Sequence, residues 1–196
     1  MQWFSGLRLT DLRLPEAFLS ACPGPAFGVD GTRQAADVAA GPLIGTIVKP
    51  SVGLTAAETA GWSPGFVPRA STSSRMTSCR RMARAVMAVI NAHAERTGKR
   101  VMYAFNPTGE VDEMRTHHDL VVEPGGTCVM ASMNSVGLTG MLALRRHSRV
   151  SIHAHRRGRG YRSRHPGLGF DYRAWSVFWR LAGTDHLHVS GIASKF

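Results

Sequence analysis

The sequence predicts an α/β fold, in which parallel strands alternate with helices as in part of a (β/α)8 or TIM barrel. Short apolar runs rich in β-branched residues are separated by amphipathic stretches of about ten to fifteen residues, which is typical of βαβ units. Polar residues recur where the runs end, and barrel active sites lie at the carboxyl ends of the strands. With 196 residues, the chain is long enough for one substantial core and shorter than most complete barrels.

Residues 1–43 are predicted to be a connector with little regular structure, the remnant of an N-terminal domain. The stretch from Leu7 to Leu14 alternates like a strand, but Pro15 and then Pro23-Gly24-Pro25 interrupt the chain. Because Met1 stands only a few residues before this strand, we expect an upstream domain that this chain lacks.

Residues 44–196 are predicted to form a truncated barrel. Its first helix, from Met82 to Gly98, has apolar residues at helical spacing and a glycine at its end. Further helices are expected at Glu110 to Leu120, Leu138 to His147 and Tyr172 to Ala182. Strands are expected near residues 44–49, 101–106, 127–131, 150–154 and 186–189.

Polar side chains at the strand ends mark the candidate site. Parallel strands present their carboxyl ends at one edge of a sheet, so we expect these side chains to converge on one rim. A lysine after a single strand is also compatible with an ordinary solvated strand end, but the repetition favours a site. The residues are Lys49, Asn106, His155, Arg156 and His188.

Six segments in order resemble the catalytic barrel of RuBisCO-like proteins, form IV of the RuBisCO large-chain family. These proteins share the RuBisCO fold but usually not its carboxylation reaction. The resemblance implies a homodimer in the intact family and a small-molecule sugar phosphate as the ligand. The segments are Leu7 to Pro15, Gly24-Pro25, Gly45 to Pro50, Asn106 to Gly109, Ile152 to Arg156, and Gly183 to His188 with Lys195 beyond.

The resemblance also implies a reaction. Family chemistry begins with removal of a proton beside a carbonyl, and Mg²⁺ stabilises the enediolate that forms. Isomerisation, tautomerisation and decarboxylation or carboxyl transfer share this step, so the choice among them stays open. By resemblance, the catalytic residues are Lys49, His155 and Lys195, and the substrate and phosphate ligands are Asn106, Arg156 and His188.

Two departures argue against true carbon dioxide fixation. Ser51 stands where RuBisCO has a second lysine, and Ala131-Ser132 replaces its His-Asp pair. We therefore expect a relative of RuBisCO that does not carboxylate ribulose bisphosphate.

The segment 61–82 departs furthest from the family. In the family, the motif F-x-K-D-D-E on the second strand supplies a carbamylated lysine and two acidic magnesium ligands. This chain has no acidic residue between Glu58 and Glu95. Pro64, Pro68 and a Ser/Thr/Arg tract predict irregular structure in place of strand two. One choice of GC-rich codons for residues 62–82, read one base earlier, yields LVAGLCAAGVDFIKDDELQAD. We interpret the segment as frameshifted, real or from sequencing, and expect a chain that has lost its metal site and its activity.

The formal net charge of +11 would ordinarily indicate nucleic acid as a partner. The restored reading of residues 61–82 replaces four arginines with one lysine and five acidic residues, which removes eight of the eleven positive charges. We therefore expect no nucleic-acid partner. A basic binding module through residues 155–165 and a degraded, non-catalytic gene product remain the alternatives.

Other features exclude further classes of protein. No apolar run reaches membrane-spanning length, and the three cysteines are far apart, so we expect a cytoplasmic protein without a membrane partner. His117 and His118 are expected to be exposed helix residues rather than ligands. His186 is expected to be a hydrogen-bonded strand histidine rather than a catalyst.

Overall fold

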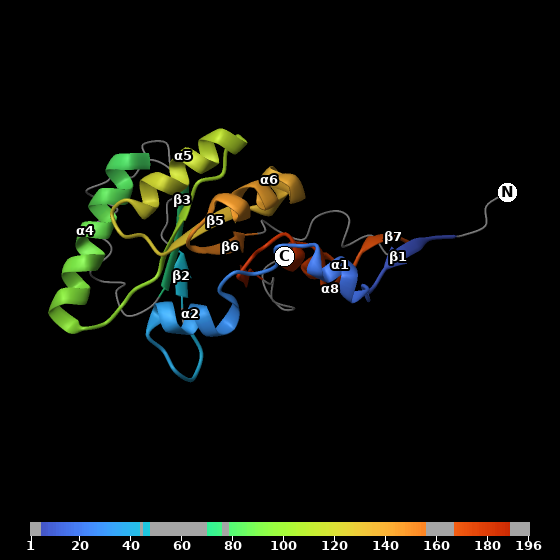
Figure 1. Ribbon diagram of the computed structural model, residues 1–196, viewed down its shortest axis with the longest axis horizontal. Helices are drawn as coiled ribbons and strands as arrows, with labels where there is room; N and C mark the ends of the chain where they lie inside the picture. Colours follow the sequence, from blue (N-terminus) through green and yellow to red (C-terminus); the bar gives the residue numbers. More distant parts are fainter. Residues whose placement is uncertain (1–4, 44, 48–69, 76–78, 156–166, 189–196) are drawn as a thin grey trace.

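The computed structural model describes residues 5–43, 45–47, 70–75, 79–155 and 167–188 (Figure 1). Within these ranges six strands form one sheet in the order β2-β3-β4-β5-β6-β8, and β1 pairs with β7 in a separate two-stranded sheet. Every strand pair is parallel. A parallel sheet whose strands follow chain order needs a crossover between successive strands, as the alternating pattern predicted.

The strands expected in the sequence are confirmed at five places. The strands are β1 (Leu7–Leu9), β2 (Gly45–Ile47), β3 (Ala70–Arg75), β4 (Tyr103–Asn106), β5 (Cys128–Ser132), β6 (Ser151–His155), β7 (Leu168–Phe170) and β8 (His186–Leu187). The helices are α1 (Glu16–Ser20), α2 (Gly28–Ala36), α4 (Cys79–Thr97), α5 (Val111–Val122), α6 (Met133–His147) and α8 (Tyr172–Leu181). Among the described residues, no helix combines the length and apolar character needed to cross a membrane.

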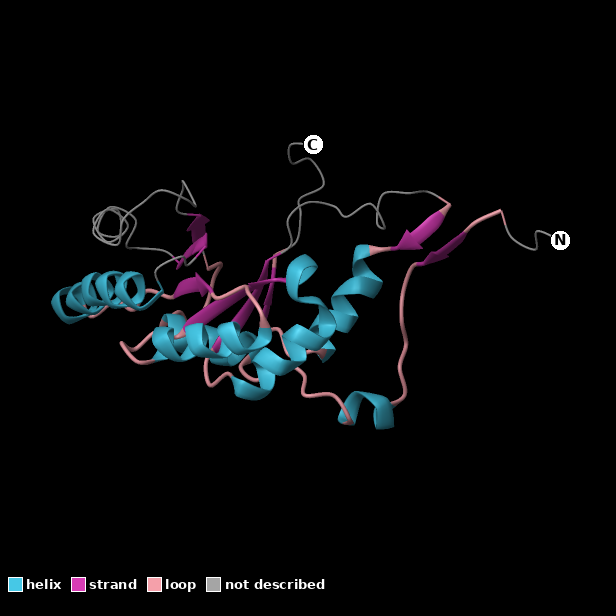
Figure 2. Cartoon of the chain, turned by 90° about the horizontal axis from the view of Figure 1, so that it is seen from above, coloured by secondary structure: helices cyan, strands magenta, loops and turns pink. Residues whose placement is uncertain are grey.

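The core lies on both faces of the sheet because strand side chains alternate. On β5, Val129 and Ala131 belong to the larger cluster, which includes residues of α4, α5, α6 and α8. Cys128 and Met130 belong to a smaller cluster on the opposite face, against which Ala35 of α2 packs. In Figure 1, α4, α5 and α6 lie on one side of the strands and α2 lies on the other, and Figure 2 shows the same sheet from above.

The expectation that strand two is disrupted is not confirmed for the described part of segment 61–82. Residues 70–75 form β3 between β2 and β4, and residues 79–82 belong to α4. Parallel pairing uses backbone groups of any sequence, and an unfilled place between two strands would leave both without partners. The register with β4 shifts between Thr72 and Arg75, so the strand carries one irregularity. Residues 61–69 and 76–78 lie outside the described residues.

The expectation of little regular structure before residue 44 is wrong for residues 28–36. The backbone N–H groups of Phe27 and Gly28 donate to Asp185 Oδ1, at 2.6 and 3.0 Å, and so the first turn of α2 is capped by a residue from the far end of the chain. Helices begin with N–H groups that lack intrahelical partners, and a carboxylate stabilises them. This cap is remote in sequence, so no local motif indicated it.

Helix α6 begins five residues before its predicted start at Leu138. The helix is broken at Gly137, which has φ 64° and ψ −177°. A backbone at positive φ suits glycine and interrupts the helical ladder. The apolar periodicity therefore begins after the break, although helical structure starts at Met133.

Candidate active site

Three of the six predicted site residues lie at the carboxyl ends of strands in the same parallel sheet. Asn106 ends β4, His155 ends β6, and His188 directly follows β8. Strands β6 and β8 are neighbours, with His153 paired to His186. Two residues further along, His155 and His188 face each other across this pair. We call the edge formed by these three strand ends the rim.

The two rim histidines contact each other directly. His155 Nδ1 and His188 Nδ1 are 3.1 Å apart, and the ring centroids are separated by 5.1 Å. The backbone around His188 is held at two points: its N–H donates to Ala154 O at 3.0 Å, and the Tyr172 hydroxyl donates to its carbonyl at 3.2 Å. A bond between two Nδ1 atoms needs one donor and one acceptor, so at least one of the rings is neutral while the bond persists.

Two further histidines lie deeper on the same face of the sheet. Burial and the neighbouring imidazoles His186, His188 and His155 lower the pKa of His153 from 6.5 to about 3. Burial also lowers the pKa of His186, whose Nε2 lies 2.6 Å from Thr32 Oγ1. The expectation of a hydrogen-bonded strand histidine at 186 is therefore confirmed. Burial disfavours the charged form of both inner rings.

Asn106 shapes the loop that follows β4. Its Oδ1 accepts bonds from the backbone N–H of Thr108, at 3.1 Å, and from the Thr108 hydroxyl. Thr108 Oγ1 in turn accepts the N–H of Ser132 at 2.9 Å, which ties the loop to the start of α6. These contacts use the Asn106 oxygen as an acceptor, and its Nδ2 is a hydrogen-bond donor.

The loop after Thr108 continues directly into α5. Glu110 is the N-cap, and reciprocal bonds between Glu110 and Glu113 form a capping box. The loop after β4 is therefore bonded to the end of β5, and it leads into a helix whose first turn is capped by its own side chains.

The other three predicted site residues, Lys49, Arg156 and Lys195, lie outside the described residues, so their roles stay predictions. His153 is a further member of the histidine group that was not among the predicted site residues. Its signal was the spacing: His153 and His155, like His186 and His188, are two residues apart, and alternate strand residues share one face. His118, expected to be exposed, is instead fully buried between helices.

The described strand ends do not fit magnesium. Mg²⁺ prefers hard oxygen ligands, with carboxylates among them. Strand β3 reads Ala-Ser-Thr-Ser-Ser-Arg. The strand ends at the rim add an amide, a hydroxyl and two imidazoles, and no carboxylate ends any of the strands β3, β4, β5 and β6.

Comparison with known proteins identifies relatives of the whole chain. Residues 28–196 match the family described as ribulose bisphosphate carboxylase large chain, catalytic domain. A 3-oxo-isoapionate-4-phosphate transcarboxylase/hydrolase from Xanthobacter autotrophicus is 52% identical over 201 residues, which covers 98% of this chain and 49% of that protein. A 3-oxo-isoapionate-4-phosphate decarboxylase from Rhizobium etli is 41% identical over 202 residues, covering 98% and 48%.

A solved structure agrees with these matches. The crystal structure of a rubisco-like protein from Burkholderia fungorum superposes with a TM-score of 0.91 at 42% identity, over 97% of this chain and 50% of that one. The chain thus spans about half the length of the relatives it matches. With the family match over residues 28–196, these likenesses show that the chain belongs to the RuBisCO large-chain family, among its RuBisCO-like members.

Proposed function

We propose that this chain is the catalytic-barrel part of a RuBisCO-like protein that binds a phosphorylated 3-oxo sugar acid at the rim. Two relatives are named for 3-oxo-isoapionate 4-phosphate, and they cover nearly all of this chain. The substrate carries a phosphate and a carboxylate, both anionic. The rim offers groups of the kind that recognise such anions.

The observation that carries the proposal is the contact between His155 and His188 at the ends of neighbouring parallel strands. The two imidazole rings place ring nitrogens, which are able to donate hydrogen bonds to an anion, at the ends of two neighbouring strands. Asn106 adds a neutral donor from the end of β4. Arg156, which follows β6 directly in the sequence, is the further phosphate ligand that the resemblance implies.

In the decarboxylation of a 3-oxo acid, negative charge develops on the oxygen of the 3-oxo carbonyl. When a 3-oxo acid loses carbon dioxide, the electron pair of the broken carbon–carbon bond moves onto that oxygen, and the carbon is protonated afterwards. A donor held close to the oxygen stabilises the charge. We assign this role to His155, with Lys49 and Lys195 as proton carriers by resemblance, and keep His188 as a phosphate ligand.

We further propose that the chain as written binds substrate without magnesium-dependent turnover. It has no acidic residue between Glu58 and Glu95, the interval that includes the family's metal strand. Losing the charge stabilisation of a catalytic metal costs several kcal/mol, or roughly a thousandfold or more in rate. The frameshift interpretation accounts for this loss without any change in the remaining site residues.

Binding and turnover are tested separately. In calorimetry, 3-oxo-isoapionate 4-phosphate should bind the chain, and His188→Ala should weaken binding by about tenfold or more, the loss expected of a charge-assisted bond. His93→Ala, a histidine of α4, is the control and should leave affinity unchanged. Equal affinity of the His188→Ala variant would contradict the assigned site.

Turnover is followed as release of carbon dioxide in the presence of Mg²⁺. The chain as written should show none, whereas a chain carrying the restored reading of residues 62–82, supplied with the remainder of the family's length, should show activity. Magnesium-dependent turnover by the unaltered 196 residues would overturn the inactivity proposal. We also propose a homodimer for the intact protein, for which light scattering should give twice the chain mass.

A further inference from the structure

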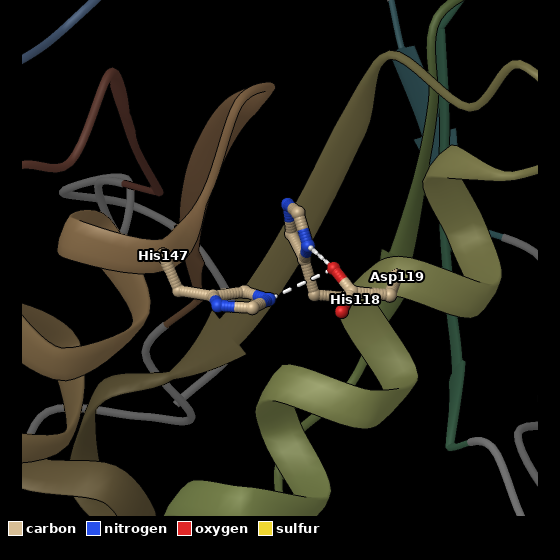
Figure 3. Close-up of side chains that lie close together, drawn as sticks. All are labelled: His118, Asp119 and His147. Atoms are coloured by element: carbon tan, nitrogen blue, oxygen red, sulfur yellow. Dashed lines mark hydrogen bonds and ion pairs between the residues drawn. The ribbon is translucent and has the colours of Figure 1, made fainter.

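Three side chains from two helices converge on the outer layer of the fold. His118 and Asp119 lie near the end of α5, and His147 is the last residue of α6. His118 Nδ1 is 2.9 Å from Asp119 Oδ1, and His147 Nε2 is 2.8 Å from the same oxygen (Figure 3). One potential ligand atom from each residue lies within 4.8 Å of the others.

The fold places this cluster away from the rim. In a parallel βα unit the helix runs back along its strand, so the last turn of the helix lies near the amino end of the sheet. His118, Asp119 and His147 all lie within five residues of the carboxyl ends of their helices, whereas Asn106, His155 and His188 are at the carboxyl ends of strands. The cluster is therefore separate from the candidate active site.

We propose that His118, Asp119 and His147 bind a zinc-class transition-metal ion that clamps the end of α5 to the end of α6. Two imidazole nitrogens and one carboxylate oxygen are the donors that Zn²⁺ and Co²⁺ take in proteins, with water completing four-coordination. Bonds of 2.0–2.2 Å in a tetrahedral site put ligand atoms roughly 3.3 Å apart. The two hydrogen-bonded distances need to lengthen by only about half an ångström to reach that spacing.

The degree of exposure suits entry of an ion. His118 is fully buried and held in place, while the side chains of His147 and Asp119 are 30% and 52% exposed. One ligand is thus fixed by the core, and two are accessible to a hydrated ion from solvent. The His118 and His147 rings meet edge to face with centroids 5.0 Å apart, so both nitrogens are aimed at Asp119 rather than at each other.

A positively charged residue close to the cluster, Arg149, opposes the binding of a cation. Arg149 is exposed, follows His147 by two residues, and acts electrostatically on His118. A positive guanidinium near a cation site weakens metal binding. Removing it should therefore strengthen binding, an effect that a purely hydrogen-bonded His-Asp-His contact has no reason to produce.

The test is titration of tag-free, metal-stripped protein with Co²⁺, read by visible absorption and calorimetry. We expect one Co²⁺ per chain with the intense absorption of a tetrahedral site, and a higher midpoint of thermal unfolding that EDTA reverses. His147→Gln and Asp119→Asn, both at accessible positions, should each weaken binding at least tenfold. Arg149→Ala should strengthen it severalfold.

His117→Gln is the matched control, because His117 is the neighbour of His118 in α5 but is outside the cluster. It should bind Co²⁺ within about twofold of the unaltered chain. Circular dichroism of each variant checks that the fold is retained. No stoichiometric binding by the unaltered chain, undiminished binding by His147→Gln, or equal loss in His117→Gln would each overturn the proposal.

Discussion

Arg145 and Asp185 form a buried ion pair between α6 and the start of the last strand. Arg145 Nη1 donates to Asp185 Oδ2 at 3.2 Å, and the two side chains are 6% and 0% exposed. The same carboxylate accepts the backbone N–H of Ile152 at 2.8 Å, while its other oxygen caps α2. One carboxylate thus joins α2, α6 and β6.

Asp185→Asn should therefore be strongly destabilising. It leaves the Arg145 guanidinium buried without its counter-charge, and breaking such a pair from one side costs about 3–5 kcal/mol. The free energy of unfolding in urea measures the loss. Asp112→Asn, which removes the exposed pair with Arg115, is the comparison and should cost under about 1 kcal/mol. Similar losses in both variants would contradict the role given to burial.

Gly183→Ala should also destabilise the fold. Gly183 has φ +104°, and an added Cβ would lie 2.2 Å from Arg145 Cγ. Strain and the displacement of a buried arginine together should cost more than about 2 kcal/mol. Gly41→Ala isolates the backbone effect, because Gly41 has φ +86° with nothing within 4 Å of the added atom. Its expected cost is about 1 kcal/mol, and urea unfolding that ranks Gly41→Ala as the worse variant would refute the steric argument.

Stability should fall as the solution is acidified below about pH 6.5. His153 has a folded-state pKa of about 3, against 6.5 for an unperturbed histidine. Between these values the unfolded chain binds a proton that the folded chain excludes. The contribution of His153 to the free energy of unfolding is complete above pH 6.5. It is lost as the pH falls toward 3, at up to about 1.4 kcal/mol per pH unit. From pH 7 to 5 the loss from this residue should be about 2 kcal/mol.

Replacing His153 tests that assignment. His153→Gln removes the titrating group, so its unfolding free energy should vary less steeply between pH 7 and 5 than that of the unaltered chain. His186 and His118 also have lowered pKa values, mainly through burial, so some dependence should remain. An unchanged slope in the variant would show that His153 is not the group responsible.

Thr108→Val should loosen the start of α6. The substitution keeps the shape of the side chain but removes the acceptor for the Ser132 N–H and the donor to Asn106. Leaving such partners unsatisfied costs about 1–3 kcal/mol. Urea unfolding should show this loss, and amide exchange at Ser132 should accelerate. Ser135→Ala, a nearby exposed hydroxyl in the first turn of α6, should change neither measurement appreciably.

The repeating local patterns of the chain were sufficient to predict most of the sheet. Apolar runs predicted β2, β4, β5, β6 and β8, because the period of two and the β-branched composition are local properties. Parallel order followed from the helices between them. Since parallel strands end at one edge, the positions of Asn106, His155 and His188 at the rim followed as well. The two His-x-His spacings, at residues 153–155 and 186–188, also predict that the two histidines of each strand share one face.

Only the tertiary structure decided the features that depend on a partner distant in sequence. Strand β3 has no apolar alternation, and it forms where β2 and β4 each present backbone groups to it. Helix α2 lacks a local cap and receives one from Asp185. A side-chain pattern reports which face of an element is apolar, but it carries no information on which remote backbone or charge completes that element. The meeting of His118 with His147 has the same origin, because it depends on how two helices pack.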